Sequence, residues 1–288
     1  GWRSNVSNTY RNMLWEAQQS GYAIPAFNYT DIWEFLAITE AAEELDAPVY
    51  AATAKDTVDA LGVDICGSLG KIEYAKTNGN FFNHLDHCTM VDRCKAAIDA
   101  GYQSVMFDGS HLPIDKNIAK VREVSEYVKQ KGGFTEGEVG QILGRSEEGC
   151  YAGGAYMATM EDCVRMVEEG GVDSLAIGIG NQHGFYAAPP KLNIPLLAQV
   201  NKELDIPLVL HGSSGLSEDV VLECIKNGIC KVNVGTELHR AYKCRVQEVI
   251  GKEPTNYAVV RFAVPAKEAI KEVVKRWIVL CGAAGKRK

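Results

Sequence analysis

The sequence predicts an α/β fold, a (β/α)8 TIM barrel with an additional N-terminal helix and C-terminal helix. Eight short apolar runs alternate with amphipathic stretches along the 288 residues, an order that is typical of eight strand-and-helix units. The runs are continuous rather than alternating, as in parallel strands that helices cover on both faces. The eight predicted strands are Ala23–Phe27, Ala47–Ala54, Asn80–Asp86, Ser104–Asp108, Phe134–Val139, Ser174–Ile179, Pro207–Leu210 and Lys231–Val234.

Capping residues and helical periodicity predict the segments between the strands. Thr159 is a good N-cap with Asp162 three residues later, and Gly170-Gly171 stops the apolar periodicity just before the next strand. Ser217, followed by two acidic residues in the first turn, opens a helix in the same way. The additional helices are expected around Tyr10–Gln18 and from Pro265 to Gly282.

The main alternative fold is a doubly wound open sheet. We favour the barrel because there are eight units, and because Asn28-Tyr29-Thr30 stands where a dinucleotide-binding Gly-x-Gly-x-x-Gly would follow the first strand. No linker divides the chain, so residues 1–288 are expected to form a single domain. The loop Gln141–Tyr156 is Gly-rich and too long for an ordinary turn, which indicates a lid or, alternatively, a surface loop.

Composition and charge exclude several classes of protein. Thirty basic residues against 37 acidic ones give a net charge of −7 and a pI near 5.5, so no nucleic-acid partner is expected. No apolar run reaches the roughly 18 to 20 residues that span a bilayer, and the first residues lack a signal-peptide pattern. The nine cysteines include no C-x-x-C pair, as expected for reduced thiols in the cytoplasm. Cys88 stands apart only because it follows a histidine.

Three histidines stand where predicted strands end. His87, His183 and His211 are 96 and 28 residues apart, yet the C-terminal strand ends of a barrel meet at one mouth. Three neutral imidazoles with an open fourth position are typical ligands of a catalytic Zn²⁺ or a similar divalent ion. Any one of them alone is better explained as an ordinary histidine, so the prediction rests on the three together.

Acidic side chains are predicted at the same mouth. Asp86 immediately precedes His87, and Asp108 closes the fourth strand. Glu136 and Glu138 alternate along the fifth strand, so they share a face. Each carboxylate has a structural explanation as the partner of a Lys or Arg. Asp86 is the strongest candidate for chemistry because it adjoins a proposed metal ligand.

Two loops have the composition of a phosphate site. His211-Gly212-Ser213-Ser214-Gly215 leads from the seventh strand to a helix, and Asn233-Val234-Gly235-Thr236 leads from the eighth. Small residues with accessible backbone N–H groups at a helix start suit a phosphate, and barrels often bind one there. A tight turn without a ligand would also use Gly and Ser, so this signal is weak by itself.

Taken together, these motifs resemble the class II, metal-dependent fructose- and tagatose-bisphosphate aldolases. The match is collinear from about Tyr22 to Lys286. It rests on His84-Leu85-Asp86-His87, Asp108-Gly109-Ser110-His111-Leu112-Pro113, Glu136-Gly137-Glu138-Val139-Gly140, His183-Gly184, and the two loops named above. The resemblance implies an aldehyde-lyase that reversibly cleaves a ketose phosphate through a metal-stabilised enediolate. It also implies a homodimer or homotetramer.

The resemblance assigns roles to individual residues. It implies that His87, His183 and His211 hold the catalytic Zn²⁺, with Asp108 and Glu138 at a secondary position for another ion, divalent or monovalent. Asp86 matches the residue that exchanges a proton with the hydroxyl at the cleaved bond. Substrate or phosphate positions match Asn28, Gly184, Gly212, Ser214, Asn233 and Thr236. In the lid loop, Glu147 and Glu148 lie near the place of a glutamate that moves the carbon-bound proton.

The departures from the family pattern concern phosphate contacts. A lysine common after the sixth strand is replaced by Ala187, and two substrate-contacting residues after the second strand align with Ala52 and Ala54. An Asp-Pro-Arg segment whose arginine helps to bind the far phosphate is replaced by Ala258-Val259-Val260-Arg261. Each charge-assisted contact is worth about 1.5 to 3 kcal/mol. We therefore expect a substrate other than the ordinary bisphosphates, unless Arg261 or Lys191 compensates.

Three alternatives stay open at this point. The closest is a standard tagatose- or fructose-1,6-bisphosphate aldolase that gives dihydroxyacetone phosphate and glyceraldehyde 3-phosphate. A metal hydrolase is less expected, because such sites often use His-x-His on one strand, whereas His84 and His87 are three apart and cannot share a face of a regular strand. A non-catalytic sugar-binding barrel would not need Asp86.

Overall fold

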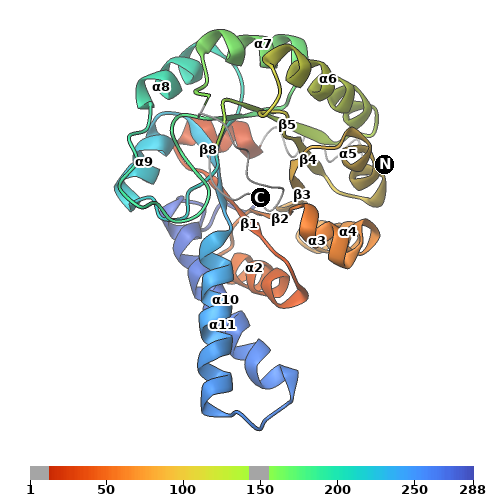
Figure 1. Ribbon diagram of the computed structural model, residues 1–288, viewed down its shortest axis with the longest axis vertical. Helices are drawn as coiled ribbons and strands as arrows, with labels where there is room; N and C mark the ends of the chain where they lie inside the picture. Colours follow the sequence, from red (N-terminus) through yellow and green to blue (C-terminus); the bar gives the residue numbers. More distant parts are fainter. Residues whose placement is uncertain (1–12, 143–155) are drawn as a thin grey trace.

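The computed structural model describes residues 13–142 and 156–288. Eight parallel strands form a closed barrel in chain order, and β1 pairs with β8 to complete it (Figure 1). The barrel and all eight predicted strands are confirmed. The strands are β1 (Ile24–Asn28), β2 (Val49–Thr53), β3 (Phe81–Cys88), β4 (Ser104–Phe107), β5 (Phe134–Val139), β6 (Ser174–Ile177), β7 (Leu208–Leu210) and β8 (Ile229–Val234).

Helices follow the strands and form the outer layer. Residues 13–20 are helical, so the additional N-terminal helix is confirmed in its described part. The others are α2 (Ile32–Glu44), α3 (Lys55–Leu61), α4 (Val63–Lys76), α5 (Val91–Ala100), α6 (Ile114–Gln130), α7 (Met160–Gly170), α8 (Ile194–Glu203), α9 (Glu218–Lys226), α10 (Thr236–Lys252) and α11 (Val259–Leu280).

The predicted helix starts are largely confirmed, with one exception. Thr159 caps α7 by accepting a hydrogen bond from the Asp162 backbone, and Gly171 ends that helix in the left-handed conformation. The prediction that Pro265 opens the last helix is wrong, because α11 begins at Val259 and contains Pro265. The first turns of α11 pack along α10 (Figure 1). This packing stabilises the helical turns before Pro265, which the proline alone would end.

The barrel interior changes from apolar to polar along the strands. Residues of one strand that face inward are two apart. On β3 they are Phe82, His84 and Asp86, and on β5 they are Phe134, Glu136 and Glu138. Phe82 and Phe134 belong to an apolar cluster inside the barrel. The polar residues that follow lie nearer the C-terminal mouth, so the sequence of each strand places its carboxylates there.

Two helices extend away from the barrel as an arm. α10 and α11 lie side by side and project beyond the other helices (Figure 1). Large apolar side chains are exposed on this arm, namely Ile250, Tyr257, Val259, Val260 and Val264. None of the helices within residues 13–142 and 156–288 is long and apolar enough to cross a membrane.

Candidate active site

A local break in β3 brings two neighbouring side chains to the barrel mouth. The pairing of β3 with β4 shifts register between Leu85 and Cys88, and His87 has a φ of 45°, in the left-handed region. A non-glycine residue there is uncommon, and such backbone strain is concentrated at functional sites. Because of the break, Asp86 and His87 both line one cavity of about 200 Å³. Cys88 instead belongs to the core between strands and helices, as an ordinary buried thiol.

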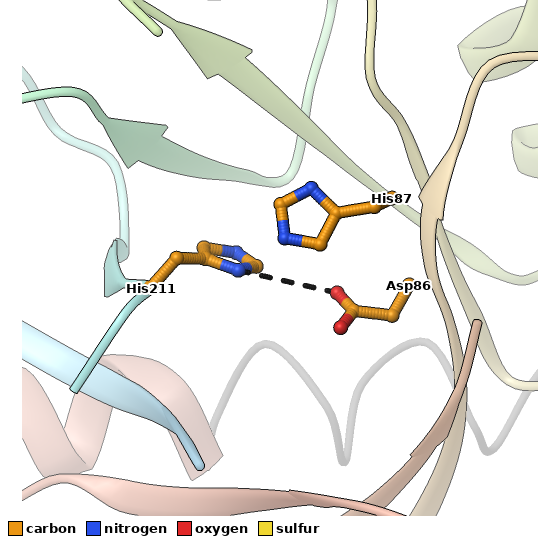
Figure 2. Close-up of side chains that lie close together, drawn as sticks. All are labelled: Asp86, His87 and His211. Atoms are coloured by element: carbon orange, nitrogen blue, oxygen red, sulfur yellow. Dashed lines mark ion pairs between the residues drawn. The ribbon is translucent and has the colours of Figure 1, made fainter. Parts of the chain in front are cut away.

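The three histidines predicted to bind metal come together at this cavity. The ring centroid of His87 lies 4.6 Å from that of His183 and 4.6 Å from that of His211, and the latter two are 6.2 Å apart. Asp86, His87 and His211 offer ligand atoms that all lie within 4.8 Å of one another. Figure 2 shows the Asp86 carboxylate directed towards the His211 ring, with 4.0 Å between Oδ1 and Nδ1.

Each of two histidines has one ring nitrogen fixed by a carboxylate. His87 Nδ1 lies 2.9 Å from Asp108 Oδ2, and His211 Nε2 lies 2.7 Å from Glu136 Oε1. Among the described residues, the other nitrogens, His87 Nε2 and His211 Nδ1, are buried without a hydrogen-bond partner. Carboxylates that orient imidazoles in this way are the usual outer shell of a metal site. The donor set and its unpartnered nitrogens therefore fit a divalent metal ion.

The protonation of these histidines differs. Burial lowers the pKa of His87, but the charges of Asp86 and Asp108 outweigh it and raise that pKa to about 10. Burial and the charge on His87 lower the pKa of His183 to about 3. The same two causes lower the pKa of His211. In the absence of metal, these shifts favour a protonated His87 ring and neutral rings for His183 and His211.

Asp86 lies between two asparagines. Its Oδ2 accepts a hydrogen bond of 2.9 Å from Asn28 Nδ2, and its Oδ1 lies 3.4 Å from Asn233 Nδ2. Burial raises the pKa of Asp86, but the surrounding charges, His87 first, outweigh it and hold that pKa well below its usual range. Asp86 is therefore an ionised, oriented carboxylate beside the histidines. A carboxylate in this place can accept a proton from a substrate hydroxyl.

Glu136 connects the site to the barrel core. Its Oε2 accepts a hydrogen bond of 2.6 Å from Lys231 Nζ, and both side chains are fully buried. Burial raises the pKa of Glu136, but the Lys231 charge more than offsets this, so the carboxylate stays ionised. Lys231 thus neutralises the group that orients His211. A carboxylate inside the barrel was expected to pair with a Lys or Arg, and Glu136 pairs with Lys231 in this way.

A second group of potential ligands lies next to the first. His87, Asp108 and Glu138 also offer atoms within 4.8 Å of one another. Asp108 is held by Ser110, whose backbone N and hydroxyl donate to its Oδ1. Burial and the Asp108 charge raise the pKa of Glu138 well above its usual range, and its Oε2 is buried without a hydrogen-bond partner among the described residues.

All six substrate positions implied by the resemblance line the same cavity: Asn28, Gly184, Gly212, Ser214, Asn233 and Thr236. Gly212 has a φ of +67°, and a Cβ atom there would lie 2.2 Å from the Gln182 carbonyl oxygen, so only glycine fits. Ala54, Gly235 and His239 complete the lining with Ser213, Asp86 and the three histidines.

Comparisons with known proteins agree with this geometry. Residues 8–286 match the family described as fructose-bisphosphate aldolase class-II. The chain belongs to this family. Members of this family are aldehyde-lyases that depend on a metal ion. The family therefore excludes two of the alternatives, the metal hydrolase and the non-catalytic barrel.

Two curated relatives of this aldolase carry a more specific name. The 6-phospho-5-dehydro-2-deoxy-D-gluconate aldolase of Bacillus licheniformis is 38% identical over 279 residues, covering 96% of this chain and 95% of the relative. The enzyme of the same name from Bacillus velezensis is 36% identical over 281 residues, covering 96% of each.

Solved structures of aldolases match the whole barrel. The YdjI aldolase from Escherichia coli K12 has a TM-score of 0.84 at 27% identity, with 97% of this chain and 98% of that chain covered. A putative fructose-1,6-bisphosphate aldolase from Coccidioides immitis has a TM-score of 0.84 at 25% identity, with 96% of each chain covered.

The two basic residues that the sequence offered as replacements for the missing phosphate contacts, Arg261 and Lys191, lie away from the cavity of this aldolase. Arg261, considered as a replacement phosphate ligand, pairs with Glu253 on the arm at 3.0 Å, and neither it nor Lys191 lines the cavity. Glu147 and Glu148 lie outside the described residues. The two ends of that loop are joined, since the Gln141 backbone N donates to the Tyr156 carbonyl oxygen at 2.6 Å.

Three residues near the site were missed by the sequence reasoning. Lys231 is two residues before Asn233 and so faces inward from the same strand, a signal that alternation could have given. His239 is three residues after Thr236, on the same side of a helix. No local sequence pattern indicates that Glu34, 205 residues away, lies beside His239.

Proposed function

We propose that this aldolase cleaves 6-phospho-5-dehydro-2-deoxy-D-gluconate, or a close analogue with a carboxylate at one end and a phosphate at the other. The relatives at 38% and 36% identity that carry this name support the substrate. The cavity supports it as well, because no Lys or Arg occurs among the described residues that line it. A bisphosphate brings two highly charged groups, whereas this substrate brings only one phosphate.

The observation that carries the proposal is the cluster of His87, His183 and His211 around Asp86, in which two ring nitrogens lack a hydrogen-bond partner among the described residues. We assign the three histidines as metal ligands, through Nε2 of His87 and Nδ1 of His211. Zn²⁺ is the proposed ion, because three imidazoles and an open position are its usual catalytic coordination. Asp108 and Glu138 form the proposed secondary position for another ion.

The proposed cleavage is a retro-aldol reaction. When bound, the ion would polarise the C5 ketone and stabilise the negative charge left on the fragment that carries it. Asp86 removes the proton from the C3 hydroxyl, and the C3–C4 bond breaks as the C3 aldehyde forms. The electron pair of that bond stays with the C4–C6 fragment. After protonation at C4 this fragment is dihydroxyacetone phosphate, and the other product is 3-oxopropanoate.

The remaining residues bind and orient the substrate in this proposal. Asn28 and Asn233 hold the Asp86 carboxylate on both oxygens, so its orientation is set before substrate binds. The phosphate binds where the loops after β6, β7 and β8 meet. Its contacts there are Gly184, Gly212, Ser214 and Thr236, which line the cavity together. Glu147 and Glu148, which lie in the predicted lid loop, are assigned the proton that returns to carbon.

We further propose that the protein is a homodimer or homotetramer in the cytoplasm. The exposed apolar residues of the α10–α11 arm, Tyr257 at 87% exposure above all, support an interface there. The eight cysteines among the described residues are free thiols, in keeping with a reducing compartment. Light scattering after size-exclusion chromatography measures the mass, and a monomer at micromolar concentration would contradict the oligomer.

Product identification tests the reaction itself. The protein is loaded with Zn²⁺ and incubated with the substrate, and mass spectrometry should detect dihydroxyacetone phosphate and 3-oxopropanoate in equal amounts. A chelator should abolish the reaction, and added Zn²⁺ should restore it. Borohydride added during turnover should leave the protein mass unchanged, since the mechanism uses no Schiff base. Activity that survives chelation, or a trapped adduct, would overturn the proposed mechanism.

A further inference from the structure

One contact joins the three loops that meet at the proposed phosphate site. The guanidinium carbon of Arg240, in the second turn of α10, lies 5.2 Å from the centre of the Phe185 ring, within the range of a cation–π interaction. Phe185 belongs to the loop between β6 and α8. A Cβ atom at Gly215, in the loop after β7, would lie only 3.2 Å from the Phe185 Cα and Cδ1 atoms, so the phenylalanine packs on that loop. The contact therefore connects the loops after β6, β7 and β8.

The loop that carries Phe185 is held in place by the next residue, Tyr186. The Gln182 backbone N donates a hydrogen bond of 3.0 Å to the Tyr186 hydroxyl, which in turn donates one of 2.8 Å to the Gly212 carbonyl oxygen. The hydroxyl thus links the loops after β6 and β7. Phe185 is nevertheless 46% exposed. Its ring is a platform on the surface of a well-anchored loop, and the Arg240 guanidinium lies on this platform.

Arg240 stands beside two residues that line the cavity. Thr236 is four residues earlier on α10, so it lies on the same side of the helix, one turn closer to the barrel. Gly184 directly precedes Phe185 and also lines the cavity. Both residues are assigned to the phosphate in the proposed function. Arg240 itself is exposed and lies at the rim, so its long side chain can reach a phosphate held between Gly184 and Thr236.

The charge of Arg240 differs in its surroundings from others on the arm. Arg245 pairs with Glu248 at 2.6 Å, and Arg261 pairs with Glu253 at 3.0 Å. In the parts of the chain that the structure describes, Arg240 forms no such pair, and its guanidinium lies over the aromatic ring instead. Stacking occupies the flat face of a guanidinium and leaves the N–H donors at its edge for an acceptor. A phosphate matches the geometry of these donors.

We propose that Arg240 binds the phosphate of the substrate from the rim of the cavity, and that Phe185 positions its guanidinium. The inference rests on the proposed function and names the cation for its single phosphate. Arg240 is a specificity-determining residue that contacts the substrate, and Phe185 is a positioning residue that acts through it. The positive charge that Ala187 does not supply comes in this way from α10. One cation serves one phosphate, so the second phosphate of a bisphosphate gains nothing from it.

Exchange of a carbon-bound hydrogen measures this contact without any aldehyde. The proposed cleavage, run in reverse, removes a proton from the carbon of dihydroxyacetone phosphate that bonds to the aldehyde. In D2O the zinc-loaded protein should therefore replace this hydrogen by deuterium, which NMR detects. Dihydroxyacetone, which has the same ketone and hydroxyl but no phosphate, is the comparison substrate.

Four variants and one control are assayed for this exchange. Arg240→Met removes the charge, and Arg240→Lys keeps it without the planar group. Phe185→Leu removes the platform, and Phe185→Tyr keeps it. Lys243→Met, at an exposed residue of α10 that does not line the cavity, is the matched control.

The expected result is a loss that follows the phosphate. Arg240→Met should raise the KM for dihydroxyacetone phosphate about 10- to 100-fold, because the contact is charge-assisted on both sides. Exchange of dihydroxyacetone should stay within about twofold. Arg240→Lys should recover part of the loss, because a charge remains. Phe185→Leu should raise the same KM by a smaller factor, Phe185→Tyr should restore it, and Lys243→Met should behave as wild type.

Calorimetric titration with inorganic phosphate tests the same contact without turnover. Zinc-loaded wild type and zinc-loaded Arg240→Met are compared, and any contact between phosphate and the ion is common to both. The ratio of the two Kd values therefore reports the Arg240 contact. We expect the Kd to be at least about tenfold higher in the variant.

Other results would count against the inference. Equal losses with both ketones in Arg240→Met would make Arg240 a purely structural residue. A KM for dihydroxyacetone phosphate within about twofold of wild type, or an unchanged Kd for inorganic phosphate, would overturn the inference while leaving the aldolase intact. Wild-type protein that exchanges neither ketone would overturn the proposed reaction instead, and the two Kd values for inorganic phosphate would then decide the inference by themselves.

Discussion

Asp86 and His87 are consecutive residues of β3, yet both side chains reach the cavity at the barrel mouth. Consecutive residues of a regular strand point to opposite faces. The register shift after Leu85 and the left-handed φ of His87 remove this restriction. The proposed base and a proposed metal ligand are therefore held side by side by the backbone itself.

Replacing Asp86 by Asn should lower kcat by about 10²- to 10⁴-fold, because a general base typically contributes this much. The amide can still interact with Asn28 and Asn233, so the cavity should keep its shape. Metal content, measured by atomic emission, should stay at the wild-type level. Asp115→Asn, on the exposed face of α6, is the control. Turnover within a few-fold of wild type would remove Asp86 from the mechanism.

Metal binding should release about one proton at neutral pH. The pKa of His87 is raised to about 10 in the metal-free protein, so its imidazolium must lose a proton before Nε2 can bind an ion. His183 and His211 are already neutral, because their pKa values are lowered. Below pH 10 the apparent affinity should therefore rise about tenfold for each pH unit.

Calorimetric titration of Zn²⁺ into the metal-free protein at pH 7.5 measures this release. Two buffers with different ionisation enthalpies give the number of protons from the difference in apparent heat. A His87→Gln variant should bind weakly and release none. A wild-type heat that is independent of the buffer would show that His87 is neutral before metal binds.

Removing Lys231 should destabilise the protein strongly. Lys231→Met leaves the fully buried Glu136 carboxylate without its ion-pair partner, and breaking a buried pair costs about 3 to 5 kcal/mol of unfolding free energy. Replacing both, as Lys231→Met with Glu136→Leu, should recover much of that stability. Urea unfolding of the metal-free proteins measures both effects. A single variant as stable as wild type would show that the pair contributes nothing.

The same double variant should bind metal more weakly than wild type, because it loses the carboxylate that orients His211. Loss of such an outer-shell partner typically lowers metal affinity about 10- to 100-fold. The comparison separates the two roles of Glu136, since stability recovers while metal affinity does not. Unchanged metal affinity would mean that Glu136 does not position His211.

The sequence predicted the parts of this protein that depend on local pattern. Continuous apolar runs placed all eight strands, and Thr159 with Asp162 placed the start of α7. His87, His183 and His211 were predicted to lie together because each follows or ends a strand, and the C-terminal ends of all strands in a closed barrel lie at one mouth. The resemblance added Asn28 and Thr236, and both line the cavity.

Features that depend on contacts distant in sequence could not be predicted in this way. Regular alternation argued that His84 and His87 cannot share a face, and only the break in β3 makes both face inward. Pro265 was taken as a helix start because the packing of α11 against α10 is invisible in the local sequence. Glu34 and His239 meet only after the barrel closes between β1 and β8.

The central claim is that this class II aldolase acts on a carboxylate-bearing ketose phosphate. The most direct measurement is kcat/KM of the zinc-loaded protein for cleavage of three compounds: 6-phospho-5-dehydro-2-deoxy-D-gluconate, fructose 1,6-bisphosphate and tagatose 1,6-bisphosphate. With two or three charge-assisted phosphate contacts absent, we expect the first compound to be preferred by at least about 10²-fold. Equal or higher kcat/KM for either bisphosphate would contradict the account and identify a standard bisphosphate aldolase.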